Sequence, residues 1–166
     1  MSERKQNKKI DKRAPVIVGV GDLVDRSKED GLNPQELLAK ACEHAIQDSG
    51  IKELSKHIDY VGVVRFTVDF LTATNQSNFQ YSNFPRTLAN KLNISAKNEV
   101  YAPMGGNSPQ VLLEDALVKI STGETDCALL SGGEALQTMI AKLKAGMSLD
   151  WLDEPGGSPE MIGNND

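Results

Sequence analysis

The sequence has few cysteines, few histidines and no long apolar run. No apolar run approaches the roughly 20 residues that cross a bilayer, and no apolar signal-peptide core lies near the start. We therefore expect a cytoplasmic protein without a membrane span. The two cysteines, Cys42 and Cys127, have no metal-ligand spacing and are expected to be free thiols in a reducing compartment.

Basic residues are outnumbered by acidic ones, 18 to 23. The net charge of -5 over 166 residues argues against nucleic-acid binding, which favours a basic face. A hydrophobic content of 39% and a charged content of 25% are typical of a soluble protein, and the length predicts one domain with a real core. We expect neither a metal site nor a bound cofactor.

Apolar runs and helical patterns alternate along the chain. β-branched and apolar runs predict strands at residues 15–20, 60–66, 98–101 and 126–131. Apolar residues at helical spacing predict helices at residues 34–49, 87–92, 109–122 and 134–144. The βαβαβα order predicts an α/β fold, in which a mostly parallel sheet is flanked by helices.

Capping signals define the first helix. Asn33 is a good N-cap, Pro34 suits the first helical position, and Glu36 favours the positive end of the helix dipole. Gly50 ends the helix. Cys42 lies on the apolar stripe of this helix, which predicts a packed core thiol.

Composition divides the chain into three parts. Residues 1–13 are polar and basic and are expected to be a disordered tail. Residues 14–145 form the expected domain. Residues 146–166 are Gly/Pro-rich and acidic, with Trp151 as the sole large anchor. Residues 67–83 form a long loop of the kind that is functional or covers a site.

The turn between the third strand and the third helix is the candidate site. Gly105, Gly106, Asn107 and Ser108 join the two elements. The first N–H groups of a helix have no intrahelical partner and suit an anion, an oxyanion or a carbonyl oxygen. Capping alone also explains Ser108, and the glycines alone explain the turn.

Two enzymatic interpretations of this turn are weak. Gly106-Asn-Ser-Pro-Gln110 departs from the nucleophile elbow G-x-S-x-G at its last position. Such a serine needs a histidine after it, whereas His44 and His57 both precede it and are expected at the surface. A phosphate cradle needs a lysine or a third glycine, and neither is present.

Residues 104–136 resemble the segment around the acyl-accepting cysteine of thiolases. In that family the cysteine lies at a helix N-terminus and is followed by Ser-Gly, an I-x-x-G-x-x-D spacing and a strand that ends in A-G-G-x-E. Ile120-Ser-Thr-Gly-Glu-Thr-Asp126 matches the spacing, Leu130-Ser-Gly-Gly-Glu134 matches the strand, and Ser108 matches the serine. Residues 15–21 match the family's first strand, and the resemblance extends over residues 14–162.

The departure from this pattern falls on the nucleophile, because Gly106 stands where thiolases have the cysteine. A helix N-terminus lowers the pKa of a thiol there and generates the thiolate. Gly106 keeps that electrostatic setting without sulfur, so no covalent acyl-enzyme can form at this position. We expect no catalytic residue in this chain and a binding role for residues 105–108.

The resemblance implies the N-terminal half of a thiolase-like protein. Gly106, Leu149-Asp-Trp151 and the Pro-Glu-Met-Ile-Gly ending resemble a branch whose members are often named acetyl-CoA acetyltransferases. Its implied function is acyl-CoA acyl transfer, with coenzyme A as part of the substrate and this chain alone inactive. The alternative is a non-catalytic acyl-CoA or lipid binder or an assembly subunit. The resemblance also implies that a fifth strand and the second half are absent, and that copies of the chain pair through residues 98–102.

Overall fold

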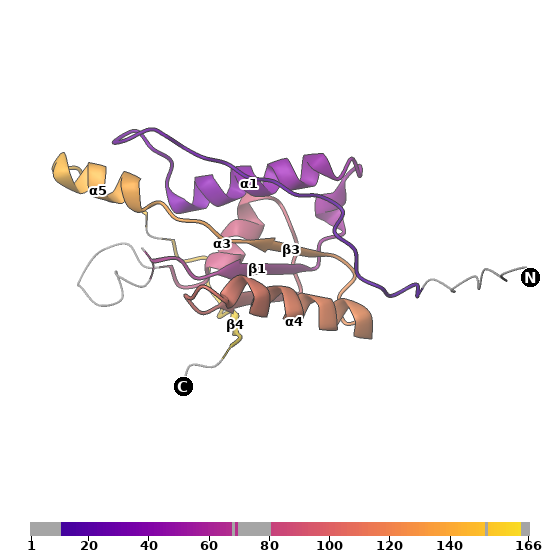
Figure 1. Cartoon of the computed structure of the whole chain (residues 1–166). Coiled ribbons are helices and arrows are strands. Elements are labelled where there is room, and N and C mark those ends of the chain that lie inside the picture. Colours follow the sequence, from indigo (N-terminus) through magenta and orange to yellow (C-terminus); the bar gives the residue numbers. More distant parts are fainter. Residues whose placement is uncertain (1–10, 68, 70–80, 152, 164–166) are drawn as a thin grey trace, which may run out of the picture.

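The structure, a computed structural model, describes residues 11–67, 69, 81–151 and 153–163 (Figure 1). The basic tail predicted at residues 1–13 and the loop predicted at residues 67–83 therefore lie mostly outside the described residues.

The centre of the fold is a four-stranded parallel sheet. Its strands are β1 (Tyr60–Val64), β2 (Asn98–Ala102), β3 (Ala128–Ser131) and β4 (Glu160–Met161), in the order β3-β1-β2-β4. β1 pairs along its length with β2 and with β3. The predicted α/β fold with a mostly parallel sheet is confirmed.

Helices cover both faces of the sheet. α1 (Pro34–Asp48) and α3 (Phe84–Lys91) lie on one face, and α4 (Ser108–Thr122) lies on the other (Figure 1). α5 (Leu136–Lys144) extends beyond the sheet, and a short 3-10 helix, η1 (Leu54–Lys56), precedes β1. Phe66, Tyr81 and Phe84 pack edge to face in the larger core, with centroids 4.7–5.7 Å apart.

The capping prediction for α1 is confirmed. Asn33 and Glu36 form a capping box, in which the Glu36 N–H donates to Asn33 Oδ1 at 2.8 Å and the Asn33 N–H donates to Glu36 Oε2 at 3.3 Å. Cys42 is buried on the inner face of this helix, as predicted, while Cys127 is half-buried and both thiols are free. His44 and His57 are exposed.

The strand predicted at residues 15–20 is wrong. This segment forms no strand, and Val16 and Ile17 are 76% and 78% exposed. It lies instead along α1, where the Val20 N–H donates to Asp48 Oδ2 at 2.9 Å. A Cβ on Gly19 would lie 2.2 Å from the Ala45 carbonyl oxygen, so the missing side chain permits the close backbone contact with the helix.

Three predicted helix starts also differ from the structure. Ser108 is the first residue of α4 rather than its cap, since Asn107 holds the cap position and makes no side-chain capping bond. α5 begins at Leu136, so Glu134 precedes the helix instead of lying in its first turn. α3 begins at Phe84, three residues before the prediction, because the Asn83 side chain accepts the Arg86 N–H.

The segment after α5 returns to the sheet as its fourth strand, whereas the resemblance implied only the start of a loop region there. β4 pairs with Val100 and Tyr101 of β2, so this part of the predicted pairing edge at residues 98–102 is covered. Trp151 is buried in the core, as expected for an anchor. Over the residues that the structure describes, no helix is long and apolar enough to span a membrane.

Candidate functional site

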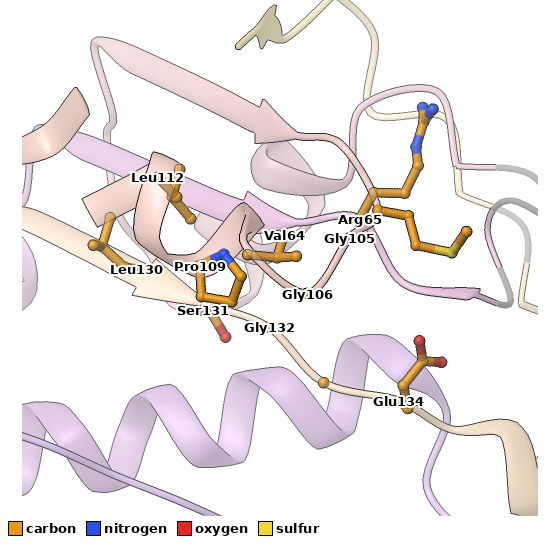
Figure 2. A pocket seen from close by; sticks show the side chains of 12 residues that line it. Val64, Arg65, Gly105, Gly106, Pro109, Leu112, Leu130, Ser131, Gly132 and Glu134 are labelled. Atoms are coloured by element: carbon orange, nitrogen blue, oxygen red, sulfur yellow. The ribbon is translucent and has the colours of Figure 1, made fainter. Parts of the chain in front are cut away.

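A cavity of about 600 Å³ opens at the carboxyl ends of β1, β2 and β3 (Figure 2). Ligands of open parallel sheets bind outside this edge, where the strands end and the helices begin. The lining residues are Val64, Arg65, Met104, Gly105, Gly106, Pro109, Leu112, Leu130, Ser131, Gly132, Gly133 and Glu134.

The cavity has an apolar floor. Val64 and Leu130 lie at the ends of neighbouring strands, and Leu112 extends from the first turns of α4. Leu112 is buried in the smaller core cluster beneath the same helix. One side chain therefore belongs both to the core and to the cavity wall, which makes the floor rigid.

Free backbone donors lie at the start of α4. The Ser108 N–H donates to the Gly105 carbonyl at 3.1 Å, closing the turn. Within the described residues, the amides of Gly106 and Asn107 donate no hydrogen bond. Both residues are exposed, so these amides can donate hydrogen bonds to a ligand oxygen at the positive end of the helix.

Gly106 leaves room where a side chain would fit. It has no positive φ, and a Cβ built on it would meet no atom within 4 Å. Neither backbone strain nor crowding therefore requires glycine at this position. The space beside the free amides is open to a ligand.

Glu134 connects the end of β3 with the segment that follows β1. The N–H and the hydroxyl of Thr67 both donate to Glu134 Oε1, each at 2.6 Å. Two donors on one oxygen fix the carboxylate at the wall of the cavity.

Arg65 belongs to the wall but is engaged elsewhere. Its Nε lies 3.1 Å from Asp69 Oδ2, and its guanidinium carbon lies 4.9 Å from the centroid of the Tyr101 ring. The Tyr101 hydroxyl donates to the same Asp69 oxygen at 3.0 Å. Burial, followed by the charge of Asp69, raises the pKa of Tyr101. Figure 2 shows the guanidinium turned away from Gly106 and Glu134.

Ser131 faces away from the cavity floor. Its hydroxyl points toward α1 (Figure 2), within hydrogen-bonding reach of the Cys42 thiol. Burial raises the pKa of Cys42, although Ser131 opposes part of this rise. The thiol is therefore protonated and packed rather than nucleophilic.

The structure brings only part of the predicted site together. Gly105 and Gly106 line the cavity, whereas Asn107 and Ser108 do not, and Ser108 is only 1% exposed. The sequence pattern missed the roles of Glu134 and Arg65. The Gly132-Gly133-Glu134 turn was the available signal for Glu134, but nothing local links Arg65 to Asp69 and Tyr101. The lining residues that the structure describes include no cysteine and no histidine.

The chain is similar to a solved structure described as a monomeric SCP2-thiolase-like protein type 1 from Mycobacterium smegmatis. The two are 32% identical, with a TM-score of 0.57, over 75% of this chain and 24% of that protein. The chain thus has a thiolase-like fold and spans about a quarter of that protein's length.

No protein-family model matches the chain, and no curated protein matches it.

Proposed function

We propose that this chain forms the acyl-binding part of a thiolase-like protein that processes acyl-CoA. In this proposal the cavity at the start of α4 holds an acyl thioester without a covalent bond to residue 106. The observation that supports this proposal is a cavity with an apolar floor and a free backbone amide at Gly106. Among its described lining residues there is neither a thiol nor an imidazole.

The cavity offers a separate binding surface for each part of an acyl thioester. The floor of Val64, Leu112 and Leu130 suits an acyl chain, because apolar burial contributes about 0.8 kcal/mol for each CH₂ group. The free amide of Gly106, which lines the cavity, suits the thioester carbonyl oxygen.

The thiolase-like fold supports acyl-CoA as the ligand class, and it extends the proposal to acyl transfer by a longer protein. Any such transfer must draw its nucleophile from a position other than Gly106, because glycine supplies none. We do not extend the proposal to pairing through residues 98–102, since β4 covers Val100 and Tyr101 and the similar protein is described as monomeric.

Calorimetry with acetyl-CoA and a longer acyl-CoA tests binding. We expect measurable heat at millimolar ligand and tighter binding of the longer chain. Absence of heat for both ligands would remove the proposal. Replacing Leu112 with Ala should weaken binding of the longer acyl-CoA more than binding of acetyl-CoA.

Intact mass after incubation with acetyl-CoA tests the absence of covalent chemistry. We expect no stable acetyl adduct. An adduct that persists after Cys42→Ser and Cys127→Ser replacement would show a different nucleophile and contradict the non-covalent proposal.

A further inference from the structure

Among the described residues that line the cavity, Glu134 is the only carboxylate and Arg65 is the only cation. The charge that a ligand meets in this cavity therefore depends on these two side chains and on the start of α4.

The Glu134 carboxylate is held in place and remains available. Thr67 donates twice to Oε1, while Oε2 accepts no hydrogen bond from a described residue. The side chain is exposed at the cavity wall. A fixed carboxylate with one open oxygen can accept a ligand N–H or O–H, and it repels a ligand carboxylate.

Arg65 does not cancel this charge. Its guanidinium pairs with Asp69 and stacks on Tyr101, and it points away from Glu134. Asp69 is buried beside it, so the Arg65–Asp69 pair is close to neutral as a unit.

The start of α4 opposes Glu134 only in part. A helix N-terminus carries about half a positive charge, whereas an ionised carboxylate carries a full negative charge. A neutral carbonyl oxygen can use the free amides without repulsion, but an anionic head group meets Glu134 as well.

We infer that Glu134 determines specificity, admitting neutral acyl derivatives such as thioesters and rejecting free carboxylates of the same chain length. The inference rests on the proposed acyl-binding function and deepens it. Within the cavity, Glu134 then distinguishes an activated acyl group from the free acid that its hydrolysis releases.

The test uses two probes of equal chain length, the hexanoyl thioester of N-acetylcysteamine and hexanoate. Their affinities are measured by calorimetry for the unmodified chain and for Glu134→Gln, which keeps an acceptor for Thr67. We expect hexanoate to gain about fivefold in affinity, as removal of one nearby charge predicts, while the thioester changes by less than about twofold. The gain should shrink at high salt.

Glu29→Gln is the matched control, because it removes one negative charge from an exposed residue outside the cavity lining. The inference on Glu134 is overturned if hexanoate gains equally in this control, or if it gains nothing in Glu134→Gln. In either case, binding of the thioester would still support the proposed acyl-binding function. Failure of both probes to bind either protein removes the proposed function itself.

Variants of Thr67 test whether its hydroxyl positions the Glu134 carboxylate. Thr67→Val deletes the hydroxyl donor, and Thr67→Ser keeps it. We expect Thr67→Val to reduce the thioester preference by about twofold, because one of the two donors that fix the carboxylate is lost. Thr67→Ser should retain the preference. Equal behaviour of the two variants would contradict a positioning role for this hydroxyl.

Discussion

The two ends of α4 place their polar groups in opposite ways. At its start, the Gly106 and Asn107 amides donate to no described residue, and Gly106 lines the cavity. Toward its other end, Lys119 is only 8% exposed and its Nζ donates to Glu160 Oε2 at 2.7 Å. Near the C-terminal end of α4 the charged side chain is paired within the chain, whereas at the N-terminal end backbone donors remain available for a ligand.

The contacts of Lys119 near the C-terminal end of α4 connect this helix with β1 and β4. Lys119 also lies 3.5 Å from Asp115, which accepts the Tyr60 hydroxyl at 2.8 Å. Through these contacts α4 is linked to β1 and, by Glu160, to β4. Substitutions there should change stability, whereas substitutions at the start of the helix should change binding.

The largest loss of stability is expected at Leu112, where the core and the cavity floor share one side chain. Leu112→Ala removes a side chain that serves both the core and the cavity floor, and it should lower the free energy of unfolding by about 3 kcal/mol. Urea denaturation followed by circular dichroism measures the loss. Leu117→Ala, on the exposed side of the same helix, should cost less than about 1 kcal/mol. Equal losses in the two variants would show that the cavity floor is not part of the core.

Lys119→Met should come next, with a loss of about 2 kcal/mol, because Asp115 and Glu160 lose their cation. The value lies below that of a fully buried pair because Glu160 is half exposed. Chemical denaturation at low salt provides the measurement. Lys144→Met on α5 is the matched control and should leave stability nearly unchanged; a comparable loss there would trace the effect to net charge.

Tyr60→Phe should cost about 1 kcal/mol at neutral pH, since one hydrogen bond to Asp115 is lost. Burial, then the hydrogen bond to Asp115, raises the pKa of Tyr60 above its ordinary value of 10.0. The native state therefore holds a proton that the unfolded state releases, and this contribution declines as the pH rises above 10. Denaturation at pH 7 and pH 10.5 should show a smaller difference between the two proteins at the higher pH. An unchanged difference would contradict the raised pKa.

Gly106→Cys should have the smallest effect on stability, within about 0.5 kcal/mol, because the position is open and unstrained. Iodoacetamide labelling followed by mass spectrometry should show that the introduced thiol reacts faster than the buried Cys42. Comparable labelling rates would contradict the open position of residue 106.

Local signals predicted the elements that depend on local chemistry. The capping box of Asn33 and Glu36, and the alternation of strands and helices from residue 60 onward, appear as expected. Residues 15–20 have the same apolar character as the buried strands. An apolar run alone does not indicate whether the segment joins the sheet. The contact of Gly19 with α1 depends on tertiary packing that sequence does not reveal.

The candidate site was predictable only where it follows from the turn into α4. Gly105 and Gly106 were found from the strand–glycine–helix pattern, and both line the cavity. Glu134 and Thr67 are separated by 67 positions, and only the parallel alignment of β1 and β3 brings their segments together.

The pairing of β4 with β2 has a consequence for the order of events during synthesis. Val100 and Tyr101 leave the ribosome well before Glu160 and Met161, their partners in the sheet. Until then the nascent chain exposes an unpaired strand edge, and Lys119 lacks its closest carboxylate. Closure of this edge therefore cannot precede the synthesis of β4.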